Sequence, residues 1–516
     1  MKLETRTVRR TTWVGMMAWA WVAAGCYGQA GTDGAAPAGR VVIYPSPGDL
    51  SGVEGLKESK VFDLRVNGMD AFVYHGSEKN DKGLSGQGVS YGNFAFAGGP
   101  VTLDIVAQDE IGTWDIKPAV AGAEKVDAKT VRLTLEKPRK FLFTGELAGQ
   151  GTQYFILSAE APETDLPSAT TAGVKYLGPG VHKFGQAWDP FVDGVHTLYV
   201  AGGAVVEATI KTKNKKNIKI CGRGLFMQAF VPHAGQASRS GGPLKREWFA
   251  DWMGTYIRSC RGVTVEGIAV LCSPSYQLEL ADCDNATVRN VTLCGFGERN
   301  NDGIHVYSRN VLVEDCFICG NDDRVCVTGL FDKDLPEAEA AVLKEEDRLT
   351  DTLVENVTLR RLVLWGLRNG GDIMLTWNAG QETRKVLIED VESLAPTNAA
   401  FVAARHGGSG TIKDVLIRNC YLYHGNLVDV LVKGPACWGK GGGRIADFTL
   451  ENIEMDAAPA QVGKRLAGQN ERSDIGRATF KNIRARGQAI TDVKETKIAV
   501  QPFVGKVEFV SGAGAQ

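Results

Sequence analysis

A short phrase recurs from residue 217 onward, and this repeat constrains the fold more than any other feature. Each copy carries apolar residues at its second and fourth positions. The copies are Asn217–Ile220, Gly262–Val265, Asn285–Val288, Asn310–Val313, Asn356–Leu359, Lys385–Ile388, Asp414–Ile417, Asp447–Leu450 and Arg477–Phe480. Neighbouring copies start 23 to 33 residues apart, except for two gaps of 45 and 46 residues, each close to two periods. A period of about 20–50 residues is typical of a solenoid, and the alternation indicates half-buried strands. The repeat therefore predicts a parallel β-helix.

The same repeat accounts for four of the eleven cysteines. Its seventh position is occupied by Val291, Cys316, Leu362, Val391, Cys420, Ile453 and Ile483. Cysteine can replace an aliphatic residue in a core as a small hydrophobe, so we predict that Cys316 and Cys420 face inward. Cys294 and Cys319 share the tenth position with Trp365. A zinc or redox site at Cys316–Cys319 is therefore disfavoured, whereas a stacked Cys294–Cys319 disulfide stays open.

Composition excludes several classes of protein. A chain of 516 residues is too long for one compact core, so two domains or an elongated repeat domain are expected. The 58 Lys and Arg against 60 Asp and Glu leave a formal net charge of −2. That balance argues against a nucleic-acid partner, which needs a basic face. An apolar content of 44% excludes bulk disorder.

Residues 1–30 have the character of an export signal and not of a folded domain. Basic residues precede an apolar stretch, Trp13 to Ala24, that is too short to span a bilayer. The segment Ala23–Cys26 resembles a bacterial lipobox, with Ala where Leu is usual. Lipidation of Cys26, giving a lipid anchor to the membrane, and ordinary cleavage near Ala24 or Ala30 both stay open. We expect an exported protein that is periplasmic, extracellular or lipid-anchored at the cell envelope.

Residues 31–170 carry strand patterns without a period. The runs are Phe62–Val66, Ala71–Tyr74, Val101–Ile105 and Val131–Leu135. Several short strands with turn signals between them predict a β-sandwich domain. The segment Pro162–Ala172 has the composition of a linker, so residues 171–516 are assigned to the β-helix domain. Two insertions, at 228–252 and 331–351, interrupt the solenoid, and a short helix is expected in the second.

The densest acidic feature spans two successive coils. Asn300–Gly303 is followed by Asn321–Asp323, and matching Ile304 to Val325 places Asp302 level with Asp323. Adjacent strands lie about 4.8 Å apart, so Asp302, Asp322 and Asp323 would crowd one place and the pKa of one should rise. A protonated acid beside ionised carboxylates is what glycosidic-bond hydrolysis requires.

Two roles besides catalysis stay open for these carboxylates. Asp and Asn are common at solenoid turns, where they bind backbone amides. Clustered carboxylates also suit a calcium site. Strict alternation from Ile304 would moreover point Asp302 and Asp323 inward, so the catalytic interpretation requires a bend at the start of each strand.

At these residues the sequence resembles the polygalacturonases, glycoside hydrolase family 28, and the related dextranases and isopullulanase of family 49. The family's Asn-Thr-Asp-Gly is similar to Asn300–Gly303, and its Gly-Asp-Asp to Asn321–Asp323, with Asn for Gly. Its Ser-Pro-x-Trp resembles Ser273–Tyr276, and its Gly-Arg-Gly turn resembles Gly222–Gly224. The resemblance covers roughly residues 175–500 and implies a pectin-lyase-like, right-handed parallel β-helix. A β-sandwich before the helix favours the family 49 side.

The resemblance implies an inverting glycoside hydrolase that acts on a polysaccharide or oligosaccharide. Asp322 corresponds to the general acid, and Asp302 and Asp323 correspond to the residues that hold and deprotonate the attacking water. No metal and no cofactor are expected. The expected substrate-binding residues are Asn301, His305, Arg324, Tyr276, Trp377 and His406.

Two departures from the polygalacturonase pattern bear on the substrate. Gly370–Asp372 stands where that family carries Gly-His-Gly, and its Arg-x-Lys has no clear counterpart, Arg405–His406 being the nearest basic pair. A neutral glycan is therefore favoured over a uronate. A polygalacturonase-type pectin hydrolase, a polysaccharide lyase and a non-catalytic glycan-binding solenoid are the alternatives. Neither the glycan nor the oligomeric state follows from the sequence.

Overall fold

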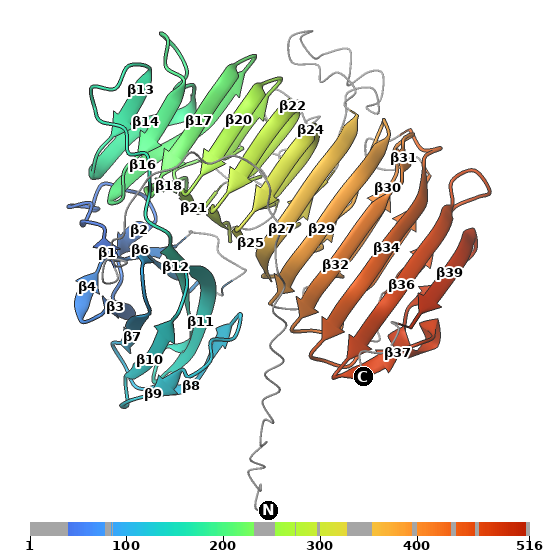
Figure 1. Cartoon of the computed structure of the whole chain (residues 1–516), viewed down its shortest axis with the longest axis horizontal. Helices are drawn as coiled ribbons and strands as arrows, with labels where there is room; N and C mark the ends of the chain where they lie inside the picture. Colours follow the sequence, from blue (N-terminus) through green and yellow to red (C-terminus); the bar gives the residue numbers. More distant parts are fainter. Residues whose placement is uncertain are drawn as a thin grey trace, which may run out of the picture. The chain divides into compact units, whose positions relative to one another are not determined.

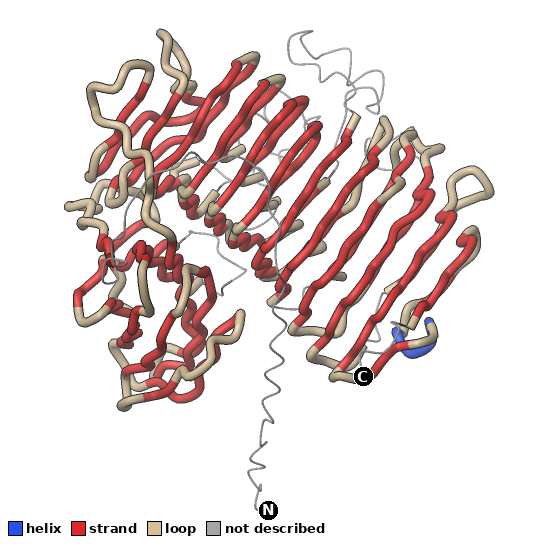
Figure 2. Tube along the Cα trace, viewed as in Figure 1, coloured by secondary structure: helices blue, strands red, loops and turns tan. Residues whose placement is uncertain are grey.

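The computed structural model describes residues 40–77, 84, 86–231, 253–273, 275–296, 300–327, 353–394, 400–434, 440–459 and 464–511. Residues Gly39–Gln516 form one compact unit, separate from Met1–Ala38. The expected export signal with Cys26, the expected short helix and most of both insertions lie outside the described residues. Figure 2 shows that strands make up most of the rest. The helix within the described part is the 3-10 turn η3 (Val493–Thr496), and none of the described helices is long and apolar enough to cross a membrane.

The strands from residue 40 to 160 form two sheets that share one core. The larger sheet has the order β2-β5-β6-β12-β11-β8, with β1 on β6, and the smaller has the order β4-β3-β7-β10-β9. Their bounds are β1 (Arg40–Ile43), β2 (Leu56–Glu58), β3 (Phe62–Val66), β4 (Met69–Ala71), β5 (Val73–Gly76), β6 (Val89–Ala97), β7 (Val101–Ala107), β8 (Ile111–Lys117), β9 (Glu124–Lys125), β10 (Thr130–Leu135), β11 (Arg139–Leu147) and β12 (Gly151–Glu160). Phe62 of the small sheet packs between Phe143 and Phe155 of the large one, at ring-centroid distances of 5.6 Å. This is the expected β-sandwich.

All strands from residue 174 onward belong to one continuous sheet of 27 strands (Figure 1). Their bounds are β13 (Val174–Leu177), β14 (Gly180–Trp188), β15 (Thr197–Val200), β16 (Ala204–Lys213), β17 (Lys216–Gly222), β18 (Leu225–Met227), β19 (Thr255–Arg258), β20 (Arg261–Glu266), β21 (Ala269–Leu271), β22 (Leu278–Arg289), β23 (Thr292–Cys294), β24 (Ile304–Glu314), β25 (Phe317–Gly320), β26 (Val325–Cys326), β27 (Val354–Gly366), β28 (Ile373–Met374), β29 (Thr383–Ser393), β30 (Val402–His406), β31 (Thr411–Ile412), β32 (Val415–Leu422), β33 (Val428–Val432), β34 (Arg444–Met455), β35 (Arg465–Ala467), β36 (Ile475–Ala485), β37 (Gln488–Ile490), β38 (Ala499–Val500) and β39 (Val504–Val510). Apart from the β36–β37 hairpin, the strands pair in parallel, each with the strand one coil away. The predicted all-β fold, a right-handed parallel β-helix preceded by a β-sandwich, is confirmed. The division into two domains near residue 170 stays a prediction.

A left-handed backbone conformation at the turns explains why the repeat is punctuated by Asn, Asp and Gly. The sixth position has a positive φ in every copy: Gly222, Gly267, Asn290, Asp315, Arg361, Asp390, Asn419, Asn452 and Asn482. Gly, Asn and Asp enter this region at the lowest cost. The amides also stack between coils, since Asn452 Nδ2 donates to Asn419 Oδ1 at 3.0 Å. The positive φ and the stacked amides together explain why Asn, Asp and Gly predominate at the sixth position.

The cysteine predictions can be compared directly with the core. Cys316 and Cys420 are 1% and 3% exposed and lie in the aliphatic core of the helix, so the predicted inward orientation is confirmed. Cys294 pairs in register with Cys319, yet the two sulfurs are not joined by a disulfide, which answers the open question of that bond. Both lie in an apolar cluster that includes Trp365 and sandwich residues such as Tyr91. The tenth position is thus the outer ladder on which the sandwich packs.

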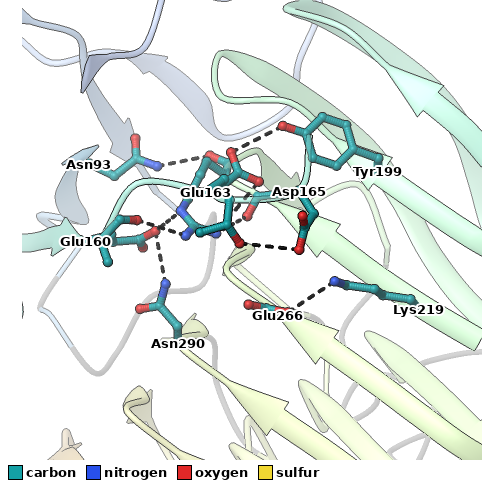
Figure 3. A network of polar contacts seen from close by, with 12 residues as sticks. Asn93, Glu160, Glu163, Asp165, Tyr199, Lys219, Glu266 and Asn290 are labelled. Atoms are coloured by element: carbon teal, nitrogen blue, oxygen red, sulfur yellow. Dashed lines mark hydrogen bonds and ion pairs between the residues drawn. The ribbon is translucent and has the colours of Figure 1, made fainter. Parts of the chain in front are cut away.

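A buried charged network ties the same surfaces together (Figure 3). Glu160, at the end of β12, accepts a hydrogen bond from Lys140 Nζ at 3.0 Å and from Asn290 Nδ2 at 3.2 Å. Its third partner is Arg223, which forms an ion pair with Glu160 and whose carbonyl accepts from Asn93 Nδ2 at 2.9 Å. The Gly222–Gly224 turn, which carries part of the family resemblance, therefore anchors the sandwich on the helix.

We expect Asn419→Val to destabilise the β-helix more than Asn419→Gly. Both variants lose the amide ladder, but only valine must be forced to the φ of 56° found at this position. The difference in unfolding free energy should be about 1–2 kcal/mol, measured by urea unfolding followed by circular dichroism. Leu416→Val, earlier on the same strand β32, is the control for a β-branched residue in extended backbone. Equal stability of the valine and glycine variants would contradict the role of φ.

Candidate active site

The three acidic residues selected by spacing lie together before two stacked strands. Asp302 precedes β24, and Asp322 and Asp323 precede β26. Ile304 pairs with Val325, and the Gly303 amide donates to the Asp323 carbonyl at 2.8 Å. Asp302 and Asp323 are therefore level on neighbouring coils, as their spacing predicts.

A shift of one residue at the strand start turns Asp302 away from the core. Gly303 and Ile304 are consecutive, and both face inward. Ile304 lies in the aliphatic core, and a Cβ on Gly303 would collide with the core residue Ile318. Because the alternation is broken here, the Asp302 carboxylate joins the outward-facing His305. This is the bend that the catalytic interpretation requires, and it explains why glycine follows Asp302.

Asp323 is held at both carboxylate oxygens by donors from the next coil. The Gly371 amide donates to Oδ1 at 2.6 Å, and Trp377 Nε1 donates to Oδ2 at 2.9 Å. Asp323 is 1% exposed. Asp322, its chain neighbour, is half-buried and keeps part of its surface open to solvent. The two adjacent carboxylates thus differ, one clamped and the other accessible.

Burial and mutual repulsion raise the pKa values of two of these groups. The pKa of Asp302 lies well above its usual range, first because of burial and then because of Asp323. The pKa of Asp322 is also raised well above its usual range by burial, by Asp302 and by Asp323, and Arg324 opposes this shift. The predicted rise in pKa within the cluster therefore has a physical basis in the fold.

A neutral histidine supports Asp302 from the outer face. His305 Nε2 lies 2.9 Å from Asp302 Oδ2, and Nδ1 contacts the Tyr307 hydroxyl. Burial lowers the pKa of His305 to about 4, so the ring is uncharged near neutral pH. A proton on Nε2 lets this ring donate to Asp302 and accept from Tyr307.

Four of the expected substrate-binding residues lie at this cluster. The Tyr276 ring stacks on His305 with centroids 4.0 Å apart. Trp377 is half-buried and contacts Asp323 through its indole nitrogen. Asn301 is fully buried, and its side-chain amide donates to the Ser273 carbonyl. Tyr276 and Trp377 are therefore placed beside the carboxylates, whereas Asn301 positions the chain that carries Asp302.

Arg324 and His406 were expected to contact substrate, and the structure corrects both. Arg324 is completely buried, and its guanidinium binds Asp372 Oδ1 at 2.9 and 2.7 Å. It also donates to the Asp322 and Asn369 carbonyls, each at 2.7 Å. His406 is likewise fully buried, with Nε2 2.8 Å from the Gly410 carbonyl. Both side chains hold the backbone. His406 faces inward through the alternation of β30, in register with the core residue Val432, whereas Arg324 is turned inward because the alternation breaks at the start of β26.

Sequence reasoning missed Asp372 and Cys326. Asp372 neutralises Arg324, and burial of Asp372 is outweighed by that guanidinium, so the pKa of Asp372 is lowered. Cys326 lies beside Asp302 and His305, with one potential ligand atom from each residue within 4.8 Å of the others. No spacing within a single strand shows this cluster. The signal was in the register, because matching Ile304 to Val325 also matches His305 to Cys326.

Comparison with known proteins points to the same region of the chain. Residues 250–331, which include all three aspartates, match the model for Glycosyl hydrolases family 28. The chain is 25% identical over 171 residues to a protein named probable rhamnogalacturonase A from Aspergillus oryzae, covering 33% of this chain and 31% of that one. It is 23% identical over 171 residues to rhamnogalacturonase A from Aspergillus aculeatus, covering 33% of each chain. The chain thus spans about a third of the length of these curated relatives.

The fold has a counterpart among solved structures. Dex49A from Penicillium minioluteum superposes with a TM-score of 0.66 at 13% identity, covering 91% of this chain and 96% of that one. The resemblance to the polygalacturonase/dextranase clan of glycoside hydrolases is therefore confirmed, with a family 28 segment at the carboxylates and a family 49-like fold over most of the chain.

We expect Asp372→Asn to lower the unfolding free energy by about 3–5 kcal/mol, because it leaves the Arg324 charge buried without its partner. Glu389→Gln is the matched control, since it breaks the 2.7 Å pair with Arg418 at the surface, and such pairs are worth about 0–1 kcal/mol. Urea unfolding at neutral pH measures both.

The pH dependence follows from the lowered pKa of Asp372. The unfolded state takes up a proton at higher pH than the folded state, so this contribution is full above about pH 4, near the ordinary Asp value. It is lost as the pH falls further. The gap between wild type and Asp372→Asn should narrow on acidification, and a constant gap would contradict the assignment.

Proposed function

We propose that the protein is an exported glycoside hydrolase that cleaves a polysaccharide or oligosaccharide with inversion at the anomeric carbon. One observation carries this proposal. Asp302, Asp322 and Asp323 converge on the outer face of two stacked coils, within the segment that matches family 28. Two carboxylates that activate water and one carboxylic acid that protonates the leaving group complete such a reaction without a further reagent.

The half-buried Asp322 is suited to be the acid. Its raised pKa favours the protonated form, and its exposed part can approach a bound sugar. In the proposed step Asp322 gives its proton to the glycosidic oxygen as the bond from that oxygen to the anomeric carbon breaks. The leaving sugar departs as an alcohol.

Asp302 and Asp323 would hold and deprotonate the water. The Gly371 and Trp377 donors fix the Asp323 carboxylate, and His305 fixes one oxygen of Asp302. The water oxygen forms the new bond to the anomeric carbon on the face opposite the leaving group, and its proton passes to a carboxylate. This single displacement inverts the configuration.

The surroundings of the carboxylates favour a neutral glycan. Arg324 is neutralised by Asp372, and Arg405 pairs with Asp429 at 2.5 Å, so neither guanidinium is offered to a uronate. The half-buried Trp377 supplies a flat aromatic surface of the kind that stacks on sugar rings, whereas Tyr276 is buried against His305. The names of the relatives add rhamnogalacturonan to the glycans to be tested. A reducing-sugar screen over dextran, pullulan, rhamnogalacturonan, polygalacturonate and algal glycans would identify the substrate.

Export and the membrane anchor are part of the proposal. They rest on the basic and apolar pattern of residues 1–30 and on the lipobox-like Ala23–Cys26. Fractionation of cells that express the full chain, with labelled fatty acid, tests both points. Label that remains on a Cys26→Ser variant would exclude the anchor.

We expect Asp322→Asn to reduce kcat by at least about 10²–10⁴, the range attributed to general acid catalysis. The amide keeps the shape of the side chain but has no acidic proton. Asp302→Asn and Asp323→Asn should also lower kcat, and the three losses should not add, because the residues serve one displacement. Asp414→Asn, at a surface turn with a positive φ, is the matched control and should leave kcat unchanged.

Proton NMR on early product measures the stereochemistry. An inverted anomer is expected. A retained anomer, or an Asp322→Asn enzyme within a few-fold of wild type, would remove Asp322 from the acid role. A product that absorbs through a new carbon–carbon double bond would instead identify a lyase.

A further inference from the structure

A mixed cluster of metal-ligand atoms lies within the candidate active site. Asp302, His305 and Cys326 are all buried, and their ligand atoms lie within 4.8 Å of one another. His305 Nε2 is 2.9 Å from Asp302 Oδ2, and Cys326 Sγ is 3.8 Å from the same oxygen. The three side chains come from two coils that stack in register, with His305 opposite Cys326.

Asp323 also contacts the thiol, outside the group of three ligand atoms. Cys326 Sγ is 3.8 Å from Asp323 Oδ2, as it is from Asp302 Oδ2. A tetrahedral Zn²⁺ with bonds of about 2.3 Å to sulfur and about 2.0–2.1 Å to nitrogen and oxygen separates its ligand atoms by roughly 3.3–3.6 Å. The observed separations bracket these values. Small side-chain movements would therefore place one cation among the ligand atoms of Asp302, His305 and Cys326.

An unsatisfied oxygen is a second, independent indication of a ligand. Asp302 is 4% exposed, and its Oδ1 has no hydrogen-bond partner in the described structure. Leaving a buried acceptor without a partner is unfavourable, and more so for a charged group. A cation bound to this carboxylate would remove that cost.

We propose that Asp302, His305 and Cys326 bind one divalent cation of the zinc class, and that the bound cation inhibits hydrolysis. Thiolate and imidazole ligands suit Zn²⁺ and its analogues, whereas Ca²⁺ and Mg²⁺ require shells of oxygen atoms. Binding releases the Cys326 thiol proton to solvent as the metal–sulfur bond forms. The inhibition rests on the proposed function, because Asp302 would no longer be free to activate water. The binding itself does not rest on it.

Cobalt reports directly on a thiolate ligand. Metal-free protein, prepared with EDTA, is titrated with Co²⁺ and the charge-transfer absorption of the cobalt–sulfur bond is recorded. One equivalent should saturate the band, and Zn²⁺ should displace the cobalt. Cys326→Ser should abolish the band, whereas Cys420→Ala, at a thiol buried in the aliphatic core, should retain it. His305→Gln should weaken binding by at least about tenfold and serves if Cys326→Ser does not fold.

Three results would overturn the proposal. The first is a folded, metal-free protein that shows no cobalt–sulfur band. The second is a band that persists in Cys326→Ser. The third is an enzyme that EDTA inactivates and Zn²⁺ restores, which would make the metal a participant in catalysis. Full hydrolysis in EDTA and its loss at one equivalent of Zn²⁺ is the expected result. If no glycan is cleaved at all, the proposed function fails while the absorption measurement still decides the binding site.

Discussion

Hydrogen-bonded stacking of parallel coils in strict register is the interaction on which this structure depends. Each coil contributes strands that pair with the same strands one coil away, so a residue is brought beside its counterpart in the repeat and not beside its chain neighbours. The register is held by the inward aliphatic ladder and by turns in which Asn, Asp and Gly take a positive φ. Residues at one position of the repeat thereby form a continuous surface. In the same way, acidic residues from two neighbouring coils are brought together in one site.

The regular alternation of inward and outward residues is interrupted at the candidate site. At the start of β24 and β26 two consecutive residues face inward, Gly303 with Ile304 and Arg324 with Val325. The extra inward position needs either no side chain, as in Gly303, or a buried charge that is neutralised, as in Arg324 with Asp372. The core thus accommodates an irregularity whose effect is to turn carboxylates outward. An ion pair in the β-helix interior supports the site without touching a ligand.

Because side chains from two neighbouring coils lie so close together, the same few atoms are suited both to acid catalysis and to metal binding. Carboxylates on neighbouring coils raise the pKa values of Asp302 and Asp322, a property suited to acid catalysis. The coil spacing that crowds them also brings the His305 imidazole and the Cys326 thiol into the same place, and together they form a ligand set for a soft cation. Catalysis and metal binding would compete for one site, because both draw on the negative charge that stacking concentrates there.

The sequence by itself determined what depends on a period: the β-helix, the inward Cys316 and Cys420, and the level positions of Asp302 and Asp323. These follow because an aliphatic ladder allows one register. The tertiary structure alone decided that Arg324, where alternation breaks, and His406, on β30, are buried supports and not residues at the substrate. The register that levels Asp302 with Asp323 also matches His305 to Cys326, but the structure alone decided that Arg324 pairs with Asp372. Such contacts are made between coils, and insertions of unequal length separate those coils by different numbers of residues. Sequence spacing therefore cannot show them until the strands are stacked.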